Sequence, residues 1–391
     1  MRWIPRTMAD DIKKMVAQRP AVLITGIRQA GKTSLLRHLF PEAAYVTLDN
    51  IALAREAVEN PRAFLARWKE SRRIIIDEIQ YAPSLFRELK MAIDEERTVR
   101  GKWLLTGSQR FSLMQEAAES LAGRIAVLEL GTLSARELRH AGVTLSPERF
   151  VFRGGFPELW ADESLDAASF YADYLKTYLE RDVRSLLRVG DLRDFQRFVQ
   201  ALAVRCGSLL NFSELARDVG IALNTVKSWL SVLEAGGVVL LLPTYAENIG
   251  KRLIKAPKLY FSDTGLAVSL MAIDRADLLA LHPRFGALWE NLVISELQKT
   301  AGGIPGRTLF YYRDSNGVEI DAFLVKGNHL RAFEIKTAAI PDERKLRFRS
   351  VLPLFRKKRY TAEAVVAVPV PEGAVSLAEF TMINPLTHDL A

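Results

Sequence analysis

Runs of apolar residues with two different periods predict both strands and helices along this chain. Continuous apolar runs at 21–25 and 74–76 predict buried strands. Apolar residues three and four positions apart predict helices at 32–40, 164–188 and 285–300. Near the C-terminus, two apolar runs flank the turn 326–328, which predicts a hairpin. The pattern favours a multidomain α/β protein, because 391 residues exceed one ordinary core.

A glycine-rich loop follows the first predicted strand and precedes a predicted helix. It reads GIRQAGKT, which is the pattern GxxxxGK[ST] in the strand–loop–helix context typical of phosphate-binding loops. Its glycines let backbone N–H groups face phosphates, and the helix N-terminus adds a favourable dipole. Lys32 would reach the β- and γ-phosphates, and Thr33 would hold Mg²⁺. The predicted ATP-binding residues are Gly26, Arg28, Gln29, Ala30, Gly31, Lys32, Thr33 and Ser34.

Two further predicted strands end in polar residues. These residues could bind Mg²⁺ and could activate and position the water that attacks ATP. Asp77 is predicted to bind Mg²⁺ through water, and Glu78 to polarise the attacking water. The strand KWLLTGSQ offers Ser108 and Gln109 as alternative water-positioning residues, and both stay open. Arg124 lies directly before a last strand, where it is expected to reach a neighbouring subunit's nucleotide. The alternative is a surface arginine that caps the strand.

The middle of the chain predicts a helical region followed by a helix-turn-helix. Ser213 and Asn224 are expected to cap its two helices, with Gly220 in the turn and a wing strand at 238–242. The outward face of the second helix is poor in side chains that read bases, so DNA contact and a spacer role both stay open. That face carries Thr225, Lys227, Ser228 and Ser231. An earlier stripe is expected to pack in the core: Tyr171, Tyr174, Leu175, Tyr178 and Leu179.

Four charged residues near the C-terminus have the order of the PD-(D/E)XK nuclease pattern. Glu290 lies on a predicted helix, Asp321 on one strand, and Glu334 and Lys336 on the next. The carboxylates would hold Mg²⁺, which lowers the pKa of bound water, and Lys336 would orient or deprotonate that water. A basic helix beginning near Arg344 would hold the phosphodiester backbone. Folds of this kind also serve as binding modules that do not cut.

Charge and composition narrow the class of protein further. The net charge is +8, and eight basic residues with no acidic one lie between Arg344 and Arg359. This distribution is compatible with a polyanionic partner. The single cysteine, Cys206, excludes intrachain disulfides and thiolate zinc clusters. No apolar run reaches the length of a membrane span or signal peptide, so a cytoplasmic protein without membrane contact is expected.

These residues together resemble a family of prokaryotic AAA-type ATPases that carry a C-terminal restriction-endonuclease-like domain of unclear function. The resemblance rests on WIPR, GIRQAGKTSLLR, IIIDEIQ, LLTGSQ, SLAGRI, RGGFPE, YLKTYLERDV, KAPKLYFSDTGL, ALWENLVISEL and EIDAFL…FEIK. It implies an AAA+ core and a homo-oligomeric ring, with a hexamer favoured and Arg124 acting in trans. The stretches RGGFPE and SDTGL are family signatures without a physical account from the sequence, and Gly154-Gly155 is expected to mark a hinge.

The predicted organisation has five segments. They are a P-loop AAA+ ATPase core at 1–142, a helical lid-like region at 143–194, a winged helix-turn-helix at 195–250, a connector at 251–285 and a PD-(D/E)XK nuclease-like domain at 286–391. The function predicted first is ATP-driven processing of DNA, with branched DNA such as Holliday junctions as a candidate substrate and ATP and Mg²⁺ as cofactors. The alternatives are an ATP-dependent regulatory switch with a non-cutting C-terminal module, and a winged-helix DNA-binding regulator.

Overall fold

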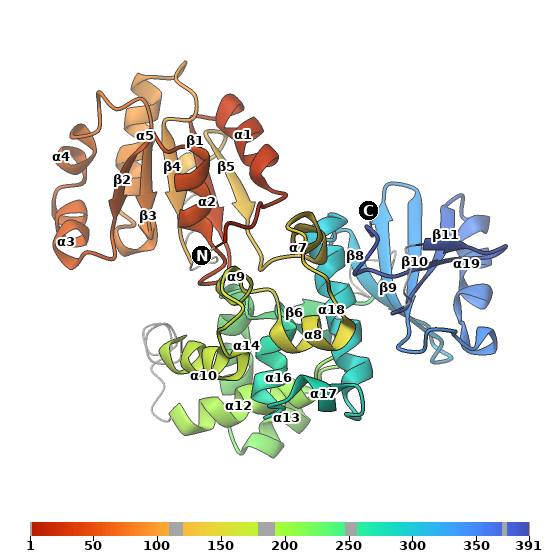
Figure 1. Cartoon of the computed structure of the whole chain (residues 1–391). Helices are drawn as coiled ribbons and strands as arrows, with labels where there is room; N and C mark the ends of the chain where they lie inside the picture. Colours follow the sequence, from red (N-terminus) through yellow and green to blue (C-terminus); the bar gives the residue numbers. More distant parts are fainter. Residues whose placement is uncertain (1, 109–119, 179–191, 247–255, 370–373, 391) are drawn as a thin grey trace. The chain divides into compact units, whose positions relative to one another are not determined.

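The computed structural model describes residues 2–108, 120–178, 192–246, 256–369 and 374–390 (Figure 1). The chain forms two compact units, each described by itself here. The first unit holds Trp3–Thr132 together with 235–237, and the second holds the rest of the chain. The compact unit with the glycine-rich loop therefore ends at Thr132, whereas the sequence placed the end of the ATPase core at 142.

The first unit is built on a parallel sheet with the strand order β2-β3-β4-β1-β5. Its strands are β1 Ala21–Thr25, β2 Ala44–Thr47, β3 Ile74–Asp77, β4 Trp103–Thr106 and β5 Ile125–Glu129. The central strands are buried along their whole length because helices cover both faces of the sheet. All carboxyl ends lie at one edge, where Thr25 pairs with Glu129. The glycine-rich loop and Asp77 both lie at this edge.

Alternate strand residues face two separate helical layers. Leu23, Ile74 and Ile76 pack in one core cluster, while Ile24 and Ile75 pack in the other. This alternation is the period-two pattern of a strand that is buried on both sides. The surrounding elements are α1 Ala9–Gln18, α2 Lys32–Leu39, α3 Ile51–Glu59, α4 Pro61–Ala66, η1 Ile79–Tyr81 and α5 Leu85–Glu95. The helix predicted at 32–40 is confirmed as α2.

The second unit begins with a helical region. Its elements are α7 Ala135–His140, α8 Pro147–Arg153, α9 Pro157–Ala161, α10 Ala167–Tyr178, α12 Leu192–Val204, α13 Phe212–Val219, α14 Leu223–Ala235, α16 Thr264–Leu270 and α17 Ala276–Leu279. Tyr171 and Tyr174 are buried against Phe156 and Phe170, with ring centroids 4.9–6.4 Å apart. The prediction that this stripe packs in the core is confirmed for these two tyrosines. Leu179 and the side chain of Tyr178 lie outside the described residues.

The predicted caps of the helix-turn-helix are wrong by a few positions. Asn211 caps α13, because its side chain accepts the N–H groups of residues 213 and 214. Ser213 therefore lies inside the first turn. Asn224 lies inside α14, which begins at Leu223. Gly220 closes α13 in the left-handed conformation as expected.

The predicted wing strand is β6 Val239–Leu242, which pairs antiparallel with β7 Lys258–Phe261. The inward residues of α14 are buried as predicted; they are Val226, Leu230 and Leu233. On the outward face, Lys227, Ser228 and Ser231 are exposed and Thr225 is half-buried. The winged helix as a functional module stays a prediction.

The C-terminal part forms a six-stranded mixed sheet with the order β12-β13-β11-β10-β9-β8. Its elements are α18 Phe285–Thr300, β8 Leu309–Arg313, β9 Glu319–Lys326, β10 His329–Ile335, η3 Glu343–Lys345, α19 Phe348–Lys357, β11 Thr361–Ala367, β12 Ala374–Ser376 and β13 Thr381–Ile383. The hairpin predicted at 326–328 is confirmed, since Lys326 pairs with His329. The basic helix begins at Phe348 rather than near Arg344, because a 3₁₀ turn occupies 343–345.

A buried carboxylate explains why the two signature stretches RGGFPE and SDTGL belong together. Asp263 accepts the N–H of Gly155 at 2.7 Å and the hydroxyl of Tyr171 at 2.6 Å, and it also caps α16. A Cβ on Gly154, which has φ +64°, would lie 2.1 Å from both Asp263 Oδ1 and the Tyr171 hydroxyl. Gly154 therefore lies in a tightly packed corner that only glycine fits, and the hinge expected at Gly154-Gly155 stays a prediction.

Candidate functional site

The glycine-rich loop is held in the conformation that phosphate binding requires. Gly26 has φ +137°, and a Cβ there would lie 2.1 Å from the Leu130 carbonyl oxygen, so no other residue fits. Gly31 has φ +89° and precedes α2. The Lys32 ammonium is buried and donates to the carbonyls of Gly26 and Ile27, both at 3.0 Å. The loop's lysine is thus already placed beneath the loop that it would serve.

Arg6, which the sequence analysis did not assign to the site, supports this loop from behind. Its guanidinium is 8% exposed and donates to the Ala30 carbonyl at 2.7 Å and to the Gly131 carbonyl at 2.6 Å. It therefore ties the loop to the segment that leaves β5. The stretch WIPR appeared only as a family signature, because no local spacing links Arg6 to Ala30.

The other predicted loop residues have less constrained side chains. Arg28 donates to the Tyr81 hydroxyl at 3.4 Å. Gln29 has φ +59° and, like Ser34 in the first turn of α2, is exposed. Their predicted contact with ATP therefore rests on the loop backbone and the helix N-terminus.

Asp77 lies at the end of β3 beside three hydroxyl groups. Thr33 and Thr106 both donate to Asp77 Oδ1, Thr106 at 2.5 Å, and Tyr45 donates to Oδ2 at 3.2 Å. Burial and the nearby Asp77 charge raise the pKa of Tyr45, so it stays a neutral donor. Thr106 and Tyr45 were not predicted. Thr33 and Asp77 together offer the hard oxygen donors that fit Mg²⁺.

Glu78, the predicted base, has a left-handed backbone with φ +56° and ψ +49°. This conformation is costly for a residue with a side chain and is found at functional sites. Ser108 donates to Glu78 Oε2 at 3.0 Å, and Gln80 donates to both Ser108 and Glu78. Of the two water-positioning alternatives, Ser108 lies beside Glu78, while Gln109 lies outside the described residues. Gln80 was missed, although it follows Glu78 by two positions.

Arg124 is placed at the opposite edge of the same sheet. It precedes β5, whose first residue pairs with Ala21, whereas the loop follows the last residue of β1. Its guanidinium forms two hydrogen bonds of 2.8 Å with Asp94, which lower the pKa of that carboxyl. A cavity of about 390 Å³ there is lined by Gln18, Arg19, Pro20, Ile93, Asp94, Arg97, Arg100, Ala122, Gly123 and Arg124. Within one chain, Arg124 is not brought to the loop.

The C-terminal carboxylates do come together, and a lysine lies among them. Lys258 of β7 is almost fully buried, and its ammonium lies 2.7 Å from Glu319, 3.0 Å from Glu290 and 4.0 Å from Asp321. Tyr260, two residues along the strand, donates to Glu290 at 2.5 Å. Burial, with Asp321 adding to it, raises the pKa of Glu290 to about 6. Neither Lys258 nor Tyr260 was predicted to belong to this cluster.

A second lysine occupies the other side of the same cluster. Lys336 Nζ lies 3.5 Å from Asp321 Oδ2 and 3.3 Å from Glu334 Oε2. Asp321 Oδ2 also accepts the Ile335 N–H at 2.7 Å, and Glu334 Oε1 accepts the N–H groups of Arg347 and Phe348. Glu334 thus caps the N-terminus of α19.

This arrangement bears on the predicted Mg²⁺ site of Glu290, Asp321 and Glu334. Among the residues that the structure describes, no group of three or more histidine, cysteine, aspartate or glutamate side chains is arranged to hold a metal ion. Lys258 and Lys336 lie between the carboxylates, and backbone N–H groups already bind several of their oxygens. As they lie, these side chains do not fit a divalent cation.

The basic segment 344–359 forms an exposed surface on and around α19. All eight basic residues are exposed: Arg344, Lys345, Arg347, Arg349, Arg356, Lys357, Lys358 and Arg359. Arg349 is neutralised by Glu343 at 2.7 Å and Glu379 at 2.5 Å. The opposite face of α19 packs its apolar residues on the sheet. The segment therefore presents a cationic face on a fixed support.

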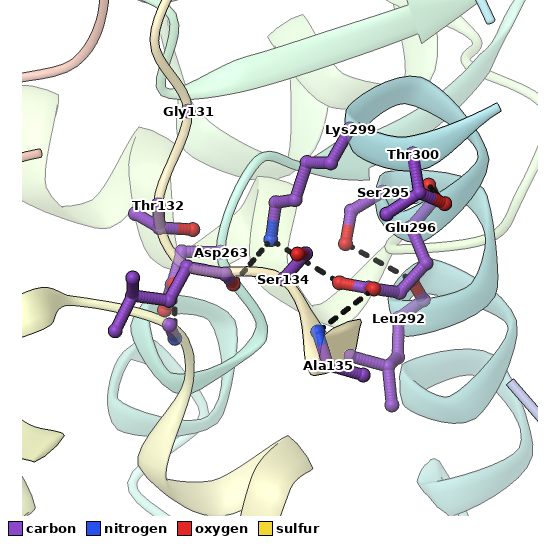
Figure 2. Close-up of polar contacts among 12 residues, drawn as sticks. Gly131, Thr132, Ser134, Ala135, Asp263, Leu292, Ser295, Glu296, Lys299 and Thr300 are labelled. Carbon is purple, nitrogen blue, oxygen red and sulfur yellow. Dashed lines mark hydrogen bonds and ion pairs between the residues drawn. The ribbon is translucent and has the colours of Figure 1, made fainter. Parts of the chain in front are cut away.

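One more buried carboxylate, Glu296 of α18, lies at the start of α7 (Figure 2). It accepts the Ala135 N–H at 2.9 Å and lies 3.6 Å from the Lys299 ammonium, which donates to the Leu133 carbonyl at 3.2 Å. Burial raises the pKa of Glu296 to about 7. Ser134 and Glu137 form a capping box beside it. Glu296 was not predicted as a site residue, since it reads as one of several polar residues on a largely apolar helix.

Comparison with known families matches three successive parts of the chain. Residues 18–139 match an AAA domain, residues 145–277 a domain of unknown function (DUF8612), and residues 285–369 another domain of unknown function (DUF4143). With the loop and carboxylate geometry above, the first match defines the class of protein: this is an AAA-type P-loop ATPase. The other two matches carry no assigned activity. No helix in the described ranges is long and apolar enough to cross a membrane.

Relatives of nearly full length place the chain in a family. An uncharacterized protein of Mycobacterium tuberculosis is 33% identical over 341 residues, covering 86% of this chain and 75% of the relative, and one of Mycobacterium bovis matches equally. An uncharacterized protein of Haemophilus influenzae is 26% identical over 275 residues, covering 62% of this chain and 67% of the relative. The chain belongs to the same family as the mycobacterial proteins.

Solved structures resemble this one only distantly. A Walker-type ATPase of Pyrococcus abyssi is 17% identical with a TM-score of 0.45, covering 68% of this chain and 96% of its own. RuvB of Thermotoga maritima is 17% identical with a TM-score of 0.32, covering 64% of this chain and 97% of its own. The assignment of the class therefore rests on the AAA domain match and the geometry of the loop.

Proposed function

We propose that this protein hydrolyses ATP to act on nucleic acid, with DNA as the partner. The observation that carries the proposal is the convergence of Lys32, Thr33, Asp77, Glu78 and Ser108 at one edge of the parallel sheet. The loop and the start of α2 supply backbone N–H groups for the phosphates and a buried ammonium for their charge, and Glu78 at the end of β3 supplies a carboxylate beside the place of attack.

The division of labour follows from the hydrogen bonds. Lys32 exchanges its two loop carbonyls for phosphate oxygens when ATP binds. Glu78 takes a proton from the attacking water, and Ser108 and Gln80 hold its carboxylate in one orientation. Thr33 and Asp77 would hold Mg²⁺, which when bound neutralises charge on the phosphates. The first test is ATP hydrolysis by Lys32→Ala. This variant should keep its fold, and its rate of hydrolysis should fall to background.

We further propose that the active form is a homo-oligomeric ring, with a hexamer favoured. Support comes from the position of Arg124, which faces a cationic cavity at the sheet edge away from its own loop. Because Arg124 does not reach its own loop, the proposed role is at a neighbour's nucleotide, as an arginine finger supplied in trans. Asp94 holds it in a defined orientation until the neighbour's nucleotide arrives.

Mixing two inactive variants tests the trans contact. Arg124→Ala chains keep an intact loop, and Lys32→Ala chains keep an intact arginine. Mixed assemblies should regain part of the activity, and native mass spectrometry gives the number of chains. If Arg124→Ala alone hydrolyses ATP like the natural chain, Arg124 is a strand-capping surface residue.

The nucleic-acid partner is proposed from the exposed cationic face of α19. Binding of labelled duplex and four-way junction DNA, followed by fluorescence anisotropy, should weaken with salt as phosphate contacts are screened. The charge reversals Arg347→Glu and Lys357→Glu should weaken it further. Arg62→Glu, an exposed arginine of α4, is the matched control that should leave binding unchanged.

A second candidate is a regulatory switch in which ATP binding sets assembly and the C-terminal domain binds without cutting. The lysines among the C-terminal carboxylates favour it. Steady-state hydrolysis with and without DNA separates the two candidates. Stimulation by DNA supports the processing enzyme, whereas slow hydrolysis indifferent to DNA supports the switch. If Lys227→Glu abolishes DNA binding and Arg347→Glu does not, the predicted winged helix binds DNA and the basic face of α19 does not.

A further inference from the structure

Four carboxylates and two ammonium groups share one cluster in the C-terminal part of the chain, in which Lys258 and Glu334 are buried and the other groups are partly exposed. Lys258 connects Glu290, Glu319 and Asp321, and Lys336 connects Asp321 with Glu334. The negative charge of the four carboxylates must be balanced by nearby positive charge. Buried carboxylates need either a metal ion or fixed cationic side chains.

Lys258 is buried within the cluster, and its strand holds it there. Its side chain is 4% exposed, β7 fixes its backbone, and its ammonium lies 5.9 Å from the centre of the Tyr311 ring. The neighbouring carboxylates raise its pKa despite burial, so it stays charged. A long side chain held by strand pairing and three acidic partners has little freedom to leave.

Mg²⁺ at this position would compete with the lysine for the same oxygens. It demands six oxygen ligands in near-octahedral geometry and keeps several waters. The carboxylate oxygens here already face ammonium groups, the Tyr260 hydroxyl and backbone N–H groups. Displacing Lys258 would also leave its ammonium buried without partners, which is costly.

We propose that the ammonium of Lys258 permanently takes the place of a divalent cation, so that this domain neither binds such a cation at these carboxylates nor cuts phosphodiesters. The carboxylates then serve to hold β7, α18, β9 and α19 together. The inference stands whether or not the ATPase acts on DNA, because it rests on this cluster alone.

The test is Mn²⁺ binding to the full chain without nucleotide, followed by electron paramagnetic resonance. The natural chain and Asp321→Asn should bind equal amounts of Mn²⁺. Lys258→Met should gain about one Mn²⁺ per chain, because three carboxylates then converge without a cation. That gain should vanish in Lys258→Met/Asp321→Asn. Lys258→Arg, which keeps the charge, and Lys326→Met, an exposed lysine of the same sheet, should gain nothing.

Two results of the Mn²⁺ measurement would overturn the proposal: more Mn²⁺ on the natural chain than on Asp321→Asn, or a folded Lys258→Met that gains none. Undiminished ATP hydrolysis reports that the first unit of each variant is folded, and circular dichroism reports the whole chain. If Lys258→Met does not fold, DNA cleavage by the natural chain and by Asp321→Asn tests the proposal instead. Mg²⁺-dependent cuts in end-labelled DNA that disappear in Asp321→Asn overturn the proposal, and uncut strands in both support it.

Discussion

The two carboxylate clusters of this protein use the same residue types with opposite kinds of partner. Asp77 and Glu78 face hydroxyl donors from Thr33, Thr106 and Ser108, and Glu78 also accepts the side-chain amide of Gln80. The C-terminal carboxylates face ammonium groups from Lys258 and Lys336. Hydroxyl groups orient a carboxylate and leave its charge in place, so it can still attract a cation or a proton. An ammonium group cancels that charge.

This difference explains why similar sequence patterns predict different chemistry in the two regions. In both regions a strand ends in acidic residues, and the chemistry depends on which groups other elements bring to them. In the P-loop unit, Lys32 lies beneath the loop and donates to the carbonyls of Gly26 and Ile27. In the C-terminal part, Lys336 belongs to the acidic motif, and a second cation, Lys258, comes from β7 outside it. The four predictions below probe the comparison from the largest expected effect to the smallest.

The largest effect is expected at Glu78, whose carboxylate must remain basic. Glu78→Gln keeps the shape and removes the base, so kcat for ATP hydrolysis should fall by about 10²–10⁴-fold. ATP affinity, measured by isothermal titration, should be retained. Glu59→Gln on the exposed end of α3 is the control and should hydrolyse ATP normally. Unchanged kcat in Glu78→Gln would remove the base from the mechanism.

At Lys258 the effect should fall on stability. Lys258→Met leaves buried carboxylates without their counter-ion and should cost about 3–5 kcal/mol of unfolding free energy near pH 8, measured by urea denaturation. The loss should shrink toward pH 5, because carboxylates with raised pKa values bind protons in the folded state there. Lys326→Met should be neutral. Equal stability of Lys258→Met and the natural chain at pH 8 would contradict the counter-ion role.

Asp263 is a third carboxylate, and its partners are a hydroxyl and backbone N–H groups packed too closely for any ligand. Gly154→Ala forces a Cβ into that corner and should lower the unfolding free energy by about 3 kcal/mol, through overpacking and backbone strain. Gly142→Ala is a matched control: its φ is +73°, but its Cβ would meet only Arg2 at 3.6 Å. The control should cost about 1 kcal/mol. Similar losses in both variants would show that φ alone matters.

Glu296 lies between these two kinds of carboxylate. One ammonium group, that of Lys299, lies 3.6 Å away, and it does not offset the rise in pKa that burial causes. Its pKa rises from about 4.5 unfolded to about 7 folded, so folding takes up a proton between these values. The contribution is fully present below pH 4.5 and is lost as the pH rises through 7. Glu296→Gln should abolish that decline, which amounts to at most about 3 kcal/mol, in unfolding measured from pH 5 to 8. A decline that persists in Glu296→Gln would assign it to another group.

The local parts of this structure were predictable from the sequence, and the long-range partners were not. The glycine-rich loop, the helix at 285–300 and the hairpin at 326–328 follow from spacing within a few residues. Asn211 was overlooked as a cap because Ser213 is an equally good capping residue. Arg6 and Lys258 reach partners more than twenty residues away, and only the folded topology brings them there. Gln80 could have been predicted, because a polar residue two positions after a catalytic base is a candidate hydrogen-bond partner of that base.

The short strand β7 links two buried polar groups of the second unit. Lys258 begins it, and Asp263 follows its end, gripping Gly155 and Tyr171. Five residue steps separate the two side chains, and an extended chain of that length, about 17 Å, has almost no slack. The strand therefore fixes the separation between the corner at Asp263 and the counter-ion Lys258. A substitution that shifts one end of the strand is expected to disturb the packing at the other.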